Sequence, residues 1–111
     1  MSLDLTLMAY DQDGNGWTVF DCNITHNLNR MADAAGIYEA LWRPDEHGYT
    51  HARDIVAVLD KGLTELRSTP QYFKGMNPEN GWGQYEGALE YLQWIADNCA
   101  QHPNARLEVS R

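Results

Sequence analysis

The sequence predicts an α+β domain in which helices cover one face of a small, mainly antiparallel, three-stranded sheet. Two segments near the start and one at the end alternate apolar and polar residues as strands do. Three segments between them repeat apolar residues at helical spacing. The predicted order is therefore ββ-α-α-α-β, which is typical of helices packed on one side of a sheet. A chain of 111 residues has the length of a single domain, spanning 1–111, and can bury its own core.

The first two segments predict a β-hairpin. Residues 3–9 place three leucines on one face of a strand, and residues 17–22 alternate again. The intervening YDQDGNG is dense in turn-forming residues. A last strand is expected at 106–111, where Leu107 and Val109 alternate with polar residues. It should pair beside the hairpin, on an edge that the sequence does not fix.

The first helix is expected to begin at the end of the hairpin, with Asn23 or Thr25 as its cap, and to end at Gly36. Its apolar face consists of Leu28, Met31, Ala32 and Ala35. A short helical turn should follow and end before Pro44, and residues 45–49 are expected to form a loop.

Two longer helices complete the prediction. The second follows Thr50 as a possible cap, and a further turn starts at Pro70, the first helical position. The apolar stripe of the second helix consists of Ala52, Ile55, Val56, Leu59, Leu63 and Leu66. The third is expected from Tyr85 to Ala100, and its apolar face consists of Tyr85, Ala88, Leu89, Leu92, Ile95, Ala96 and Cys99.

Composition narrows the function classes. The net charge is −8, and the eight basic residues are scattered, so nucleic-acid binding is not expected. No apolar run is long enough to span a membrane, and the start MSLDLTLMAYD lacks the basic region of a signal peptide. A cytoplasmic protein is therefore expected. Cys22 and Cys99 fit no metal-binding spacing and are expected to be small buried apolar residues.

The junction between the second strand and the first helix is the first candidate site. It contains Asn23, Thr25, His26, Asn27 and Arg30. Free amide groups at a helix start attract anions, and Arg30 could add to that attraction. A histidine in that position should favour its neutral form, which suits a base or a metal ligand. The same residues also fit a well-capped surface helix, and both interpretations stay open.

Two further patterns resemble metal sites but do not complete them. DQDGNG matches the first half of an EF-hand loop, yet the position of the required glutamate is Cys22. In HGYTH, His47 and His51 are four residues apart, but Gly48 and the expected cap lie between them. We therefore expect no metal and no cofactor.

Aromatic residues form another candidate site. Trp42 precedes Arg43, and Trp82 and Tyr85 follow Asn80. Two further aromatic residues of the third helix, Tyr91 and Trp94, fall outside its main apolar face. Large aromatic side chains outside a core face are typical of an interface. They predict a homodimer contact or another protein partner.

Three segments resemble a family of small proteins found in phage and prophage genomes and in some bacteria. They are NITHNLNRMADAAGIYEALWRP, NPENGWGQYEGALEYL and HPNARLEVSR. The resemblance spans roughly residues 17–111. It is carried by Asn23, Ile24, Thr25, His26, Asn27, Trp42, Arg43, Pro44, Asn80, Gly81, Trp82, Gly83 and Tyr85. It implies an intracellular phage context without an established activity.

These observations leave three functional hypotheses. The first is a small, non-enzymatic interaction or ligand-binding protein. It would use the Tyr91 and Trp94 surface, or a cleft in which Asn80 and Trp82 flank His26 and Arg43. The second is a hydrolase or transferase for a small anionic molecule, with His26 as general base. In that hypothesis Arg43 or Arg30 would hold the anion, and Asn23 or Asn27 would orient it. The third is an acidic DNA mimic, which rests on the net charge alone.

Overall fold

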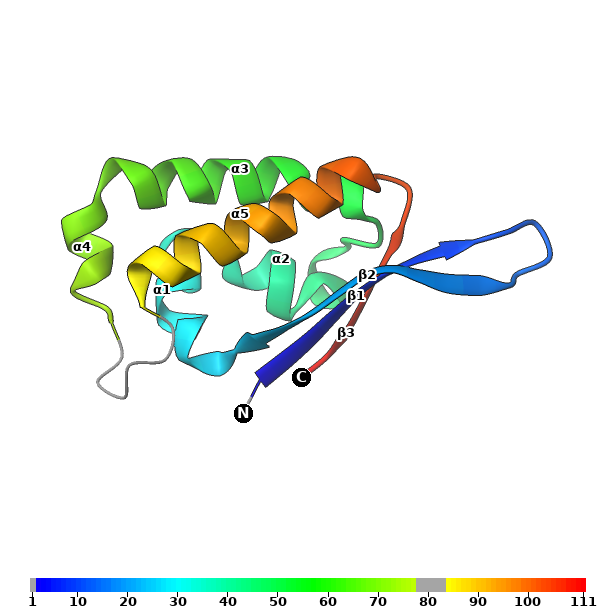
Figure 1. Cartoon of the computed structure of the whole chain (residues 1–111), viewed down its shortest axis with the longest axis horizontal. Coiled ribbons are helices and arrows are strands. Elements are labelled where there is room, and N and C mark those ends of the chain that lie inside the picture. Colours follow the sequence, from blue (N-terminus) through cyan, green and yellow to red (C-terminus); the bar gives the residue numbers. More distant parts are fainter. Residues whose placement is uncertain (1, 78–83) are drawn as a thin grey trace.

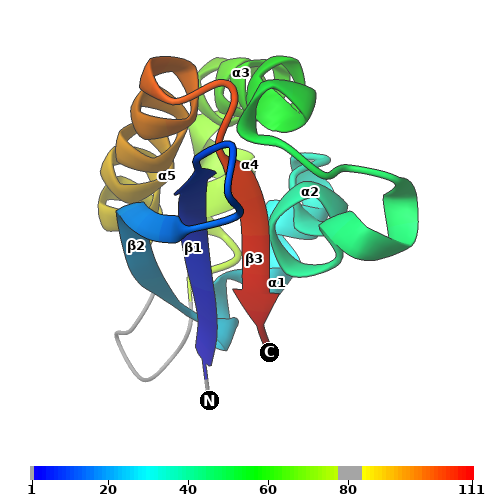
Figure 2. The same ribbon diagram turned by 90° about the vertical axis from the view of Figure 1, so that its right-hand side faces the viewer.

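A computed structural model describes residues 2–77 and 84–111 of the chain. Its three strands are β1 (Ser2–Tyr10), β2 (Gly16–Thr25) and β3 (Arg106–Ser110). They form one antiparallel sheet in the order β2-β1-β3, so the last strand pairs with β1 and leaves β1 in the centre (Figure 2). The helices lie on one side of this sheet (Figure 1). The structure confirms the predicted α+β class.

The sheet buries one face and exposes the other. Leu3, Leu5 and Leu7 are completely buried on the helix side. Residues between them in β1 point to the opposite side, where Asp4 is exposed and pairs with Asn23 of β2 and Ser110 of β3. This alternation is what the sequence pattern of β1 predicts.

The β1–β2 hairpin is longer than predicted, and its far end projects beyond the helices (Figure 1). Its turn is closed by Asp11, whose carboxylate accepts hydrogen bonds from the amides of Asp13 and Asn15, both at 2.9 Å. Pairing shifts register between Leu7 and Met8, which leaves Val19 of β2 as an extra residue in a β-bulge. The DQDGNG segment therefore forms the turn of the hairpin.

The segment after β2 is less helical than predicted. A 3₁₀ turn covers His26–Leu28, and the following helix α1 (Asn29–Ala34) has six residues. Gly36 then adopts a φ of +79°, as expected for a residue that ends a helix. The predicted apolar positions of this segment are nevertheless all buried: Leu28, Met31, Ala32 and Ala35.

Helix α2 (Tyr38–Trp42) matches the predicted turn, but a 3₁₀ helix at Pro44–His47 replaces the expected loop. Helix α3 (Ala52–Ser68) begins one residue after His51, not after Thr50. The reason is Asp54, whose carboxylate accepts hydrogen bonds from the amides of both residues, at 2.9 Å each. This reciprocal cap places His51 at the helix start.

The remaining helices are α4 (Pro70–Lys74) and α5 (Tyr85–Gln101). Helix α5 packs against α3 and lies above the sheet (Figure 1). Among the described residues, no helix combines the length and apolar character needed to cross a lipid bilayer.

Candidate functional site

Asn23 belongs to β2 and not to a helix start, which corrects the prediction that it caps the first helix. Its side-chain amide donates hydrogen bonds to the Ser2 hydroxyl and to the Asp4 carboxylate, both at 2.8 Å. These contacts hold the first strand against β2. The polar character of Asn23 is thus explained by cross-strand pairing on the exposed side of the sheet.

Thr25 does act as a cap, as predicted. Its hydroxyl accepts a hydrogen bond from the backbone amide of Asn27 at 3.3 Å. The element that it caps is only a 3₁₀ turn, followed by the six-residue α1. The predicted anion site at the helix start requires the aligned peptide dipoles of a longer helix. This short local structure does not supply them.

His26 lies half-buried beside the core residue Trp42, with 6.5 Å between the ring centroids. Within the described residues, three buried polar side-chain atoms have no hydrogen-bond partner: His26 Nε2, Asn29 Oδ1 and Trp42 Nε1. Within residues 2–77 and 84–111, the imidazole forms no hydrogen bond or ion pair with a carboxylate. The described part of the chain therefore offers His26 no carboxylate of the kind that orients many histidine bases.

An open hollow of about 410 Å³ lies beside this cluster. It is lined by Asn29, Arg30, Asp33 and Tyr38. Arg30 is exposed and forms no ion pair within the described residues. The acidic side chain of Asp33 lines the same hollow. The surface of the hollow therefore suits a polar ligand that carries both hydrogen-bond donors and acceptors.

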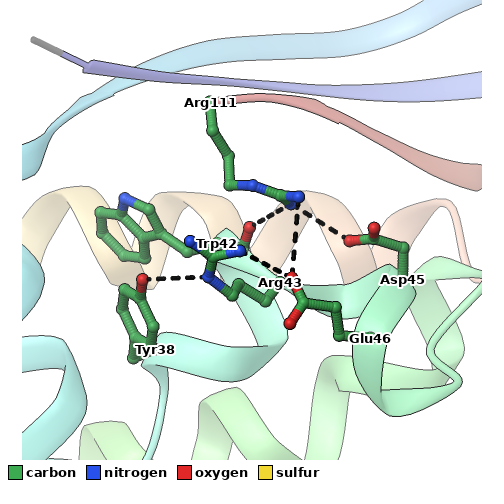
Figure 3. A network of polar contacts seen from close by, with 6 residues as sticks. All are labelled: Tyr38, Trp42, Arg43, Asp45, Glu46 and Arg111. Carbon is green, nitrogen blue, oxygen red and sulfur yellow. Dashed lines mark hydrogen bonds and ion pairs between the residues drawn. The ribbon is translucent and has the colours of Figure 1, made fainter.

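Arg43 is already engaged by neighbouring side chains (Figure 3). Its guanidinium donates to the Glu46 carboxylate at 2.7 Å and to the Tyr38 hydroxyl at 3.4 Å. The hydrogen bond to Glu46 is the main cause that raises the pKa of Arg43. Because a carboxylate of the chain occupies it, Arg43 is less suited than Arg30 to hold an external anion.

Arg111 completes this network, and sequence reasoning did not find it. Its guanidinium donates to the backbone carbonyl of Trp42 at 2.8 Å and to the Asp45 carboxylate at 3.2 Å (Figure 3). This contact lowers the pKa of Asp45. The contact ties the residue after β3 to the last residue of α2, across 69 positions of sequence, and no local pattern signals such a pairing.

Trp42 and Tyr85, both predicted to bind, are core residues in the structure. Trp42 is 1% exposed and stacks on Tyr38 with 5.4 Å between centroids. The Tyr85 hydroxyl donates to the backbone carbonyl of Leu66 at 2.7 Å. The two other members of the predicted cleft, Asn80 and Trp82, lie outside the described residues, so the shared cleft stays a prediction.

The predicted interface residues of α5 lie together over β2. The ring of Trp94 meets Phe20 edge to face at 4.8 Å and Tyr91 at 5.3 Å. The hydroxyl of Tyr91 donates to the backbone carbonyl of Asn23 at 2.7 Å. Trp94 is nevertheless 45% exposed. We call Phe20, Tyr91 and Trp94 the aromatic surface.

A hollow of about 340 Å³ adjoins the aromatic surface. It is lined by Arg67, Leu89, Glu90, Gln93, Trp94 and Asp97. The Gln93 side chain connects its walls, because it accepts a hydrogen bond from Arg67 and donates one to Asp97 at 2.8 Å. The hollow thus combines an exposed indole with two carboxylates.

The described residues contain no group of three or more potential metal ligands among His, Cys, Asp and Glu. Asp11, the first acid of the EF-hand-like segment, binds its own turn, mainly through Asn15, and this lowers its pKa. The imidazole of His51 contacts the Thr50 hydroxyl at 2.8 Å. Both cysteines are free thiols, and burial raises the pKa of each to about 12.

The chain shows no significant match to any protein-family model, to any curated protein or to any solved structure.

Proposed function

We propose that this chain is a small, non-enzymatic protein that binds a protein partner through its aromatic surface. The observation that carries the proposal is the position of Trp94. The indole is held by two aromatic neighbours, yet almost half of it is exposed. A rigid aromatic side chain that is ordered before binding costs little conformational entropy on association. Tryptophan is also the residue type most enriched at the energetic centre of interfaces.

The acidic residues near Trp94 favour a different protein over a second copy of the chain. In a two-fold symmetric dimer the same patch meets itself, so Glu90 and Asp97 would face the same two carboxylates. Like charges placed opposite each other across an interface are unfavourable. The net charge of −8 adds to this repulsion.

The cellular context is part of the proposal. A cytoplasmic protein of phage or prophage origin would act on a host or phage protein. The resemblance of three sequence segments supports the phage context.

Site-specific photo-crosslinking tests the proposal. A photoreactive derivative of phenylalanine is placed at position 94, where it retains an aromatic side chain in place of the indole, or at position 72 as a control, in bacterial cells that produce the chain. Tyr72 is 61% exposed on α4, away from the aromatic surface, and reports random collisions. We expect a discrete crosslinked protein at position 94 only. Binding of that purified protein should weaken at least tenfold with Trp94→Ala, and identical crosslinks at both positions would contradict the proposal.

A second candidate function is the binding of a small anionic molecule in the hollow lined by Arg30. It is favoured by the guanidinium of Arg30, which is exposed at this hollow and forms no ion pair within the described residues. Inorganic phosphate is a suitable probe. Phosphate should raise the melting temperature of the protein more than that of Arg30→Gln. Equal stabilisation of both proteins would remove this candidate.

A further inference from the structure

We propose that the hollow beside Trp94 receives an arginine side chain of the partner protein. This inference rests on the proposed function, because it names the chemistry of the partner at the same surface. Glu90 lies four positions before Trp94 and Asp97 three positions after it, so both share its side of α5. The two carboxylates therefore flank the exposed indole, one turn away on either side.

Both carboxylates can accept further hydrogen bonds. Glu90 forms no hydrogen bond or ion pair within the described part of the chain. From the described residues Asp97 accepts one hydrogen bond, which the Gln93 side chain donates to its Oδ1. Arg67, the basic residue of the hollow, binds Gln93 and forms no ion pair with either carboxylate. The three charged residues of the lining thus carry a net charge of −1.

This arrangement matches the chemistry of a guanidinium group. A planar cation can stack on the face of an indole, where the negative charge of the ring attracts it. Its five N–H donors can then reach carboxylates at the edge of the ring. A lysine ammonium offers neither the plane nor the fork of donors, so it should fit this hollow less well. The negative charge of the whole chain would also attract a basic partner.

Nuclear magnetic resonance of the tryptophan indole N–H groups provides the test. The chain has four tryptophans, and the Trp94→Phe variant identifies the signal of Trp94. The probes are three blocked tripeptides with arginine, lysine or citrulline between two glycines, where citrulline is the neutral counterpart of arginine. We expect the arginine peptide to shift the Trp94 signal saturably. The citrulline and lysine peptides should bind at least fivefold more weakly.

The double variant Glu90→Gln/Asp97→Asn should weaken arginine binding at least fivefold. Its matched control, Asp13→Asn/Glu39→Gln, makes the same change of net charge at exposed positions outside α5 and should bind as the wild type does. Unchanged indole signals of the other tryptophans in the absence of peptide verify that both variants fold.

Two results would overturn the inference. One is equal binding of the arginine peptide and of either other peptide; the other is an undisturbed Trp94 signal at saturating peptide concentrations. Crosslinking at position 94 does not depend on the charge of the partner. It therefore distinguishes a failure of the arginine inference from a failure of the proposed function. A specific crosslink at position 94 without a preference for the arginine peptide would reject the inference that the hollow receives an arginine. It would leave the aromatic surface as the binding site.

Discussion

The hydroxyl of Tyr91 donates a hydrogen bond to the backbone carbonyl of Asn23 at 2.7 Å and so joins α5 to β2 across 68 positions of sequence. The ring of the same tyrosine packs against Trp94. One residue therefore holds the helix on the sheet and orients the exposed indole. This dual contact connects the stability of the fold to the geometry of the aromatic surface.

Replacing Tyr91 with Phe should lower the free energy of unfolding by about 1 kcal/mol, the usual value of one intramolecular hydrogen bond. It should also shift the indole N–H signal of Trp94, because the tyrosine ring is no longer tethered. Chemical denaturation and NMR measure the two effects. Tyr72→Phe is the control, since that exposed side chain has no hydrogen bond in the described structure. Equal stability of the two variants would show that the tether is unimportant.

Two helical glycines should respond oppositely to replacement by alanine. A Cβ atom at Gly62 in α3 would overlap the Ile37 side chain and lie 3.1 Å from the Ala35 carbonyl oxygen. Gly62→Ala should therefore destabilise the protein by about 1–3 kcal/mol. At Gly87 in α5 the added carbon would meet no described atom within 4 Å outside its own stretch of helix, so Gly87→Ala should stabilise the protein by about 0.5–1 kcal/mol.

Urea denaturation of both glycine variants gives the comparison. Adding Ile37→Val to Gly62→Ala should recover part of the loss, because the smaller side chain makes room. If Gly62→Ala stabilised the protein as Gly87→Ala does, the close packing of α3 against Ile37 would be incorrect.

Removing Arg111 should raise the pKa of Asp45 towards its ordinary value. The hydrogen bond from Arg111 is the main cause that lowers this pKa in the folded protein. A lowered pKa means that the carboxylate stabilises the fold above the ordinary pKa of about 3.9, and that this contribution is lost as the pH falls through the folded value. The stability of Arg111→Ala should consequently decline less between pH 5 and pH 3.

A carbon-13 NMR titration of Asp45 measures this change directly. Arg30→Ala is the control, because that arginine forms no ion pair within the described residues. An identical Asp45 titration in wild type and Arg111→Ala would rule out the interaction.

The buried thiol of Cys99 should make the protein less stable in alkaline solution. Its pKa is about 12 in the folded chain, against about 8.5 for an exposed cysteine. Above pH 8.5 the unfolded chain releases a proton that the folded chain retains, so the free energy of unfolding falls as the pH rises. From pH 7.5 to 9.5 the fall attributable to this residue should be about 1 kcal/mol. The Cys99→Ala variant should lack this contribution to the decrease in the free energy of unfolding. An equal decrease in the wild type and the variant would contradict the prediction.

Periodicity was sufficient to predict the elements that cover the core. The face of α5 and the leucines of β1 are buried as expected, with Leu89 only partly covered. These positions follow a single pattern because each element has one buried side. Trp94 could be predicted as an interface candidate for the same reason, since it falls outside the buried face of α5.

Contacts between distant segments could not be predicted in this way. Asn23 resembles a helix cap in sequence, but its partner is Asp4 on the neighbouring strand. The contact of Arg111 with the carbonyl of Trp42 depends on how β3 and α2 meet in space. By contrast, the ion pair of Arg43 with Glu46 spans three positions and has a spacing that sequence inspection could have identified.

The extra residue Val19 determines which way the outer part of the hairpin presents its side chains. Because of it, Trp17 lies opposite Ala9, on the side of the sheet to which the buried leucines point. Deleting Val19 would turn this segment into a regular ladder and leave Trp17 opposite Ala9, whereas regular pairing that kept Val19 would move Trp17 opposite Tyr10, on the reverse side of the ribbon. The bulge therefore absorbs one residue while the half-exposed indole keeps its side of the sheet, which makes this position a natural point where β2 can gain or lose a residue.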